Sequence, residues 1–220
     1  MTRKIPALLV LLAALGGCAP TPYWTMTDQV NKVAKSTSFE FTVPEGWNRT
    51  ASADTWDRLM IDDKEQTVLL EQMRASKDGT GIHAITVTRR YPDTAFPTIK
   101  KKSTANMLPL EAADLYVSDL RKRTGLERLK VLSNTPAQLN GKPGFLLAME
   151  FKNDDGLRIR IATHGFVDKT GLYTISYRAP SLYYHGRDYG DYIKLVRSFR
   201  QLKGAFDSPP EMPAWAKFFN

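Results

Sequence analysis

The stretch that decides the fold is Phe39–Trp47, with the sequence FEFTVPEGW. Its first five residues alternate between apolar and polar side chains, which is the two-residue period of a strand with one buried face. The next three, Pro44-Glu45-Gly46, are turn formers. The sequence therefore predicts a sheet-based domain that opens with a half-buried strand and a tight turn.

The same two-residue period recurs along the chain after this opening strand. Short apolar stretches around Asp62-Asp63-Lys64 favour a hairpin, because carboxylates and glycines between strands are ordinary turn formers. The predicted strands are 59–61, 68–73, 82–90, 145–151, 157–166 and 173–177.

Two segments change to helical spacing. Leu110, Ala113, Val117 and Leu120 recur at steps of three and four and predict a helix with Pro109 in its first turn. A second apolar stripe predicts a helix over residues 188–199. Strands grouped around two helices indicate an α+β domain with a central, mostly antiparallel sheet flanked by helices.

Three of these motifs resemble PsbP-like domains. They are FEFTVPEGW, the turn sequence LNGKPG at Leu139–Gly144, and Tyr173–Ala179 followed by a helix that ends at VRSF, residues 196–199. The resemblance covers residues 38–202 and implies an α/β/α sandwich with helices on both sides of the sheet. PsbP-type proteins assist photosystem II, so the resemblance also implies binding or assistance in assembly, not catalysis.

The N-terminal sequence is typical of an exported lipoprotein. A short basic start and an apolar run of about eleven residues are too short to span a bilayer and match a signal peptide. Leu15-Gly16-Gly17-Cys18 resembles a lipobox, which implies cleavage before Cys18 and membrane attachment through lipid on this cysteine. We therefore predict a signal peptide at 1–17, a lipidated tether at 18–37, the domain at 38–202 and a tail at 203–220.

The predicted location and the net charge of the chain limit the classes of partner that we expect. Ala19 after the cysteine resembles the sorting signal of outer-membrane lipoproteins, which predicts a periplasm-facing location in a bacterium with two membranes. Nucleic acid is an improbable partner in that compartment. Cleavage before Cys18 would remove Arg3 and Lys4 and lower the net charge from +8 to +6. This excess of positive charge favours anionic partners such as phospholipid headgroups or acidic polymers, although it also suits a plain solvated surface.

Sequence motifs for catalysis and metal binding are absent. The chain has three histidines, His83, His164 and His185, without the spacing of a zinc site or a hydrolase triad. Lipidation would also remove Cys18, the single cysteine, as a metal ligand or nucleophile. We predict no cofactor and no enzyme, with an unrecognised hydrolase or transferase site near His164 or His185 as the alternative.

A basic surface is the first candidate binding site. Arg158, Arg160 and His164 share one face of their predicted strand. A three-residue turn, Lys169-Thr170-Gly171, would place Arg178 opposite Ala162 and close to these cations. The four side chains would then bind an anion or an acidic partner, unless they form a solvated face or pair with acids such as Glu150.

The C-terminal tail is the second candidate. Pro213 can begin a short helix that carries Trp215, Phe218 and Phe219. These aromatic residues either dock on the protein's own sheet or contact a partner protein. The sequence thus predicts a membrane-anchored, non-enzymatic binding or assembly-assisting domain, with binding of anionic lipid or polymer as a further alternative.

Overall fold

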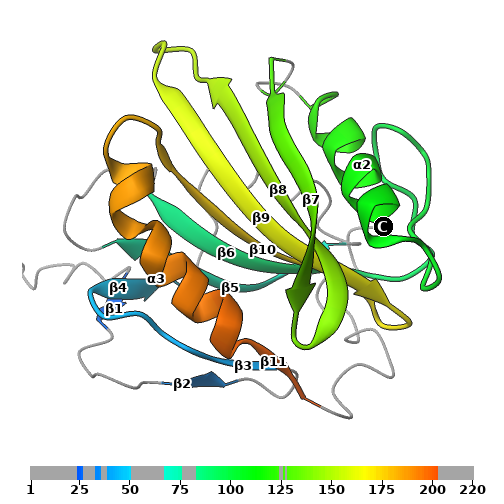
Figure 1. Ribbon diagram of the computed structural model, residues 1–220, viewed down its shortest axis with the longest axis horizontal. Coiled ribbons are helices and arrows are strands. Elements are labelled where there is room, and N and C mark those ends of the chain that lie inside the picture. The colour runs from blue at the N-terminus through cyan, green and yellow to red at the C-terminus, as the bar shows by residue number, and fades with distance from the viewer. Residues whose placement is uncertain are drawn as a thin grey trace, which may run out of the picture.

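The computed structural model describes residues 24–26, 33–35, 39–50, 67–75, 83–123, 126 and 128–202. Within these residues an eight-stranded antiparallel sheet is flanked by one helix on each face (Figure 1). The predicted α+β class and the sandwich arrangement are therefore confirmed. Among the residues described, no helix is long and apolar enough to cross a membrane.

The elements follow the sequence periods closely in most places. In chain order they are β1 (Trp24–Met26), β2 (Val33–Lys35), β3 (Phe39–Thr42), β4 (Trp47–Thr50), β5 (Thr67–Ala75), β6 (Ala84–Arg90), α2 (Pro109–Leu120), β7 (Lys130–Leu139), β8 (Lys142–Lys152), β9 (Arg158–Asp168), β10 (Gly171–Pro180), α3 (Tyr184–Ser198) and β11 (Arg200–Gln201).

The large sheet has the strand order β1-β4-β5-β6-β10-β9-β8-β7. Strands β7 to β10 form a continuous meander, whereas β10 joins β6 from the other half of the chain. A second sheet has the order β11-β3-β2. Strands β1 and β2 lie within 18–37, the predicted tether, so part of that segment pairs with the sheets.

The opening stretch FEFTVPEGW folds as predicted. Phe39 and Phe41 are buried in β3, and the ring of Phe39 stacks on Phe199 at the end of α3, with 6.2 Å between ring centroids. Gly46 takes a positive φ of 77°. The Trp47 N–H then closes the turn by donating to the Pro44 carbonyl over 3.3 Å.

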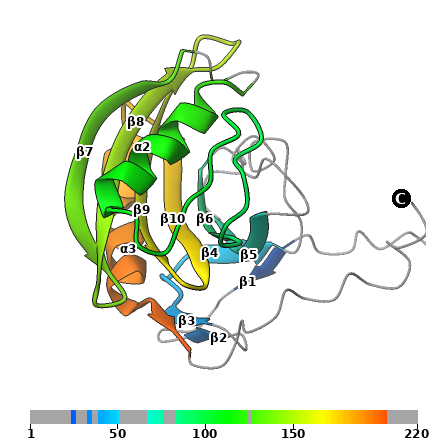
Figure 2. The same cartoon turned by 90° about the vertical axis from the view of Figure 1, so that its right-hand side faces the viewer.

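The two faces of the sheet carry separate cores, because successive strand residues point to opposite sides. Figure 2 shows α2 and α3 on opposite sides of the curved sheet. The core under α3 includes Phe39, Phe41, Trp47, Ile85, Val87, Phe166, Tyr173, Ile175, Tyr177, Tyr192 and Leu195. The core under α2 includes Phe96, Ala112, Ala113, Tyr116, Val117, Leu120, Phe145, Leu147, Met149, Ile159 and Ile161.

The structure contains strands that the sequence did not predict, namely β1, β2, β4, β7 and β11, and the predicted strand 59–61 with its turn at 62–64 lies outside the described residues. Strand β7 was not predicted, because Pro136 and the polar residues around it interrupt the alternation. It is the last strand of the sheet, where a proline is tolerated since its missing N–H would face away from the ladder. Helix α3 begins at Tyr184, four residues before the predicted start.

Candidate functional site

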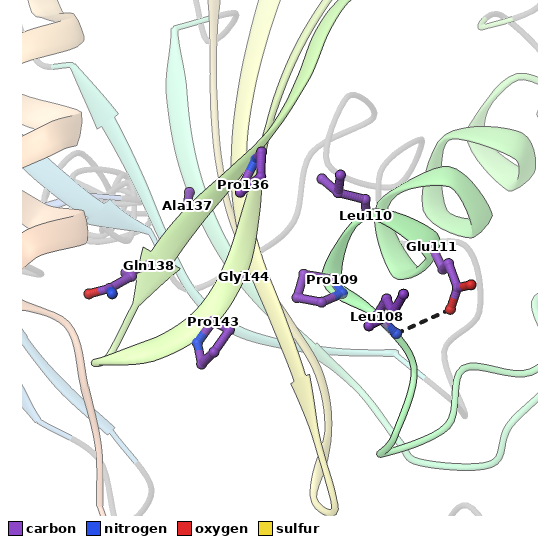
Figure 3. A pocket seen from close by; sticks show the side chains of 9 residues that line it. All are labelled: Leu108, Pro109, Leu110, Glu111, Pro136, Ala137, Gln138, Pro143 and Gly144. Carbon is purple, nitrogen blue, oxygen red and sulfur yellow. Dashed lines mark hydrogen bonds between the residues drawn. The ribbon is translucent and has the colours of Figure 1, made fainter.

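An apolar groove lies between the start of α2 and the β7–β8 hairpin. It has a volume of about 550 Å³, within the range of about 300–1,000 Å³ that is typical of ligand sites. Figure 3 shows side chains from both elements facing this space. The lining residues are Leu108, Pro109, Leu110, Glu111, Pro136, Ala137, Gln138, Pro143 and Gly144.

The helical wall of the groove is the first turn of α2. Pro109 begins the helix, and the Leu108 N–H donates to the Glu111 carboxylate over 3.1 Å, which fixes this turn. Leu108 is 64% exposed and Leu110 is 36% exposed. The predicted position of Leu110 on the buried stripe is therefore wrong: its side chain lines the groove, whereas Ala113 is buried.

The opposite wall is the β7–β8 hairpin. Asn140 and Gly141 form its two-residue turn, with positive φ angles of 57° and 69° that suit these residue types. Gly144 lies against the neighbouring strand, where an added Cβ would be 2.2 Å from the Gly165 carbonyl oxygen. Close packing therefore holds the groove floor, while Pro136 and Pro143 stay exposed along it.

The basic candidate site is only partly assembled. Arg158 and Arg160 do lie on the same face of β9, but both approach Glu150 of β8, with N–O distances of 3.5 and 3.3 Å. Their side chains remain 54% and 41% exposed. The alternative in which these arginines pair with Glu150 is therefore what the structure contains.

Arg178 lies on the other face of the sheet, so its predicted register is wrong. The β9–β10 loop has two residues, since Asp168 pairs with Gly171, and Arg178 pairs with Ile161 instead of Ala162. Asp168 stabilises this shorter turn by accepting hydrogen bonds from the Thr170 N–H and hydroxyl over 2.8 and 2.6 Å. A shift of one residue reverses the face of every side chain on a strand.

His164 is a structural residue in the core under α3. The Tyr192 hydroxyl donates to the Ile175 carbonyl over 3.0 Å and accepts from the His164 backbone N–H over 2.9 Å. It therefore accepts from His164 Nδ1 as well, over 2.7 Å, which assigns the ring proton to Nδ1. Burial lowers the pKa of His164 to about 4, so the ring is neutral at pH 7.

His83 and His185 lie beside the buried ring of Tyr177. His83 Nε2 is 2.9 Å from the Tyr177 hydroxyl and 3.1 Å from the Asp188 carboxylate. A carboxylate, an imidazole and a hydroxyl thus meet, but the Tyr177 hydroxyl donates to the Tyr184 carbonyl over 2.9 Å. Burial, reinforced by the Asp188 charge, raises the pKa of Tyr177 far above its ordinary value, which disfavours the phenolate.

His185 packs between aromatic rings near the start of α3. Its ring centroid is 5.1 Å from that of Tyr177 and 5.5 Å from that of Tyr189. Burial, followed by the nearby charges of Arg160 and His83, lowers the pKa of His185 to about 4. This environment keeps the imidazole neutral and gives it a packing role.

Other predicted sites lie outside the described residues. These are Cys18 and the tail residues Trp215, Phe218 and Phe219, whose roles remain predictions. Within the described part of the chain, no group of three or more His, Cys, Asp or Glu side chains could hold a metal ion.

The fold is similar to that of a known protein, although the sequence is not. No protein-family model matches the chain, and no curated protein matches it. The solution structure of cyanobacterial PsbP (CyanoP) from Synechocystis sp. PCC 6803 matches with a TM-score of 0.54 and 10% identity. That match covers 86% of this chain and 99% of CyanoP. This chain therefore has a PsbP-like fold.

A second solved structure is LpqN, described as involved in cell envelope biogenesis of Mycobacterium tuberculosis. It matches with a TM-score of 0.46 and 10% identity, over 81% of this chain and 88% of LpqN. Because a shared fold does not transfer an activity, the function has to be inferred from the residues of this chain.

Proposed function

We propose that this protein is a lipid-anchored cell-envelope protein that binds an apolar segment of a partner protein in the α2/β7–β8 groove, without catalysing a reaction. The observation that carries this proposal is the groove itself, in which exposed leucines and prolines from two elements face one open space. Exposed apolar clusters of this kind are typical of interaction sites.

The size of the groove fits an anchoring interaction. A volume of about 550 Å³ accommodates a few side chains, not a whole protein face. Binding would therefore depend on one or two large apolar residues that enter the groove, as at the energetic centres of other interfaces. Gln138 and Glu111 lie at the margins of the groove, and Figure 3 shows both side chains pointing outward from it, so the space between α2 and the hairpin is lined by apolar groups.

A non-catalytic role is supported by the state of the histidines. The protons of His164 Nδ1 and of the Tyr192 hydroxyl are committed to buried hydrogen bonds. The Tyr177 hydroxyl beside His83 also donates to a backbone carbonyl. Groups held in this way stabilise a core and are poorly placed to exchange protons with a substrate.

The anionic-surface alternative has less support. Glu150 approaches both Arg158 and Arg160, and Arg178 is on the opposite face of the sheet. Binding of an anionic surface would require these cationic side chains on the same face of the sheet, and they do not all lie on one face.

Membrane anchoring through Cys18 is tested by labelling cells with a clickable palmitate analogue. The wild-type protein should carry the label and sediment with membranes, whereas Cys18→Ala should lose the label and remain unprocessed. Label that persists in Cys18→Ala, or that never appears on the wild-type protein, would exclude this anchor.

Groove binding is tested by site-specific photo-crosslinking in cells. We would place p-benzoylphenylalanine at Leu110 in the groove and, as a matched control, at Leu132, which is 49% exposed on β7 and does not line the groove. One envelope protein should be captured from position 110 and not from position 132. Equal capture from both positions would show that capture is not specific to the groove and would contradict the proposal.

A substitution in the groove completes this test. Leu108→Asp should reduce capture from position 110 about tenfold or more, because a carboxylate in an apolar groove must be desolvated when the partner binds. Leu132→Asp adds the same charge outside the groove and should leave capture unchanged.

A further inference from the structure

The described chain ends at the tip of the β7–β8 hairpin, on the side of the sheet that packs under α3. The Gln201 N–H donates to Asn140 Oδ1 at the tip of the β7–β8 hairpin over 3.1 Å. Gln138, a groove residue, is two positions before Asn140 along β7, or about 7 Å at a rise of about 3.3 Å per residue. The C-terminal segment 203–220 therefore starts at the hairpin tip, and it has to pass around this tip to reach the groove on the α2 side.

This departure point is held by several contacts. The Gln201 side chain accepts from Lys142 Nζ over 2.6 Å. Its amide donates to the Thr170 hydroxyl over 3.0 Å and to the Tyr173 hydroxyl over 3.1 Å. Lys142 in turn bonds to Asp168 and lies 4.8 Å from the centre of the Phe166 ring. The segment that follows Leu202 thus leaves from a fixed place.

The C-terminal segment is long enough to span the distance from the hairpin tip to the far side of the groove. Trp215 is 13 positions beyond Leu202 in the sequence. A flexible chain of that length has a mean end-to-end distance of about 20 Å. Pro136, at the far side of the groove, is about 13 Å from Asn140 at the strand rise. The segment is therefore long enough for these aromatic residues to reach the groove.

The N-terminal segment is less well placed for this role. Strand β1 occupies the first position in the sheet and β7 the last. At about 4.8 Å between neighbouring strands, the path from one edge to the other along the sheet is about 34 Å.

The side chains of the C-terminal segment and of the α2/β7–β8 groove are chemically complementary. The segment carries Trp215, Phe218 and Phe219 after a proline-rich stretch, and the groove offers leucine and proline surfaces on which aromatic rings pack well. Lys217 lies among these aromatic residues, and Glu111 at the groove margin has the opposite charge.

We propose that the C-terminal segment Ala214–Phe219 docks in the α2/β7–β8 groove of its own chain and competes there with the partner. This inference rests on the proposed function, in which the same groove receives an apolar partner segment. Because the segment is tethered, its local concentration at the groove is in the millimolar range, and a partner must displace it.

Photo-crosslinking of the purified full-length protein in detergent tests the docking. With p-benzoylphenylalanine at Leu110, mass spectrometry should identify a product that joins this position to a peptide within 209–220. The matched position Leu132 should give no such product. The absence of a 110-to-tail product would overturn the proposal.

Isotope mixing separates docking within one chain from docking between copies. Equal amounts of ¹⁵N-labelled and unlabelled protein should give 110-to-tail products of one isotope type only. Products that combine both types would overturn docking within the chain and indicate exchange between two copies.

The competition is tested in cells with the triple variant Trp215→Ala, Phe218→Ala and Phe219→Ala. If the tail occupies the groove about nine-tenths of the time, its removal should raise partner capture from position 110 on the order of tenfold. Unchanged capture would show that the tail does not compete, and the proposed partner binding would still stand. Absence of partner capture from position 110 in both the wild-type protein and the variant, with the 110-to-tail product present in the wild type, would instead reject the proposed function and keep the docking. Partner capture that is lost only in the variant would overturn the competition, because the tail would then assist partner binding.

Discussion

Gln201 and Asn140, 61 residues apart in the chain, are joined by a hydrogen bond of 3.1 Å from the Gln201 N–H to Asn140 Oδ1. Asn140 thus has two roles, since it also takes the positive φ that the hairpin turn requires. One residue therefore connects the shape of the groove wall to the position from which the C-terminal segment leaves.

The two roles of Asn140 can be measured separately. Asn140→Gly keeps the turn geometry and loses the side-chain hydrogen bond, so the free energy of unfolding should fall by about 1 kcal/mol. Asn140→Ala adds the cost of a left-handed conformation and should lose about 2–3 kcal/mol in total. Urea unfolding of both variants checks this, and equal losses would refute the assigned strain.

Asp119 should control the stability of the protein in acid. Burial alone would raise the pKa of Asp119, but hydrogen bonds from Thr98 and Arg123 outweigh it and hold the pKa below its ordinary value. The unfolded carboxyl protonates near pH 4, so this contribution is complete above that pH and is lost as the pH falls through the lower folded pKa.

Asp119→Asn should lower the free energy of unfolding by about 2–3 kcal/mol at pH 7, because it disrupts a buried carboxylate network. The loss relative to wild type should shrink below pH 4. Asp114→Asn, an exposed change on the same helix, is the matched control and should cost less than about 1 kcal/mol. Urea unfolding at pH 7 and pH 3 makes the comparison.

Histidine burial predicts a second pH dependence, at higher pH. The pKa of His164 falls from 6.5 to about 4 on folding, mainly through burial, so the unfolded chain binds the proton first as the pH decreases. Stability from this group is complete above about pH 6.5 and is lost as the pH falls toward 4. His185 has the same direction and adds to the effect.

The titration is checked by urea unfolding of wild type and His164→Asn between pH 7 and pH 4. The variant should have a shallower pH dependence over this interval, because one titrating group has been removed, while His185 maintains part of the slope. A wild-type stability that is constant from pH 7 to pH 4 would contradict the burial of both rings.

Two glycines should respond in opposite directions to substitution by alanine. An added Cβ at Gly165 would lie 2.3 Å from the Phe145 ring, so Gly165→Ala should lower the free energy of unfolding by about 2–3 kcal/mol. Gly186 in α3 has no heavy atom within 4 Å of an added Cβ. Gly186→Ala should stabilise the protein by about 0.5–1 kcal/mol. Thermal unfolding distinguishes the two directions.

The parts of the fold that could be predicted are those in which the residue type at each position is set by local backbone conformation or by burial. Phe39 and Phe41 are buried and Gly46 has a positive φ, as predicted. A half-buried strand requires alternating apolar residues and a left-handed turn favours glycine, so both can be recognised from the sequence. Strand β7 was missed because an edge strand need not alternate and tolerates Pro136.

The candidate sites depended on relationships between elements, and these were harder to predict. The prediction placed Arg178 on the wrong face because it assumed a β9–β10 loop of three residues. The loop has two residues, and the hydrogen bonds from Thr170 to Asp168 stabilise this shorter form. The groove was missed because Leu110 fits the apolar spacing of a buried stripe. One feature of the sequence does indicate the groove. Leu108 is an apolar residue that precedes the helix at Pro109 and belongs to no strand, so neither element provides a core position for its side chain.

The pairing of β6 with β10 also bears on the order in which we expect the chain to fold. Thr88 and Thr174 share a hydrogen bond of 2.6 Å across 86 residues of sequence, whereas β7 to β10 are successive neighbours. Closing that long loop is entropically costly, so we expect the meander to form early and the β6–β10 junction late. Until β10 has been synthesised, one edge of β6 has no strand to pair with, and an unpaired edge of this kind favours aggregation.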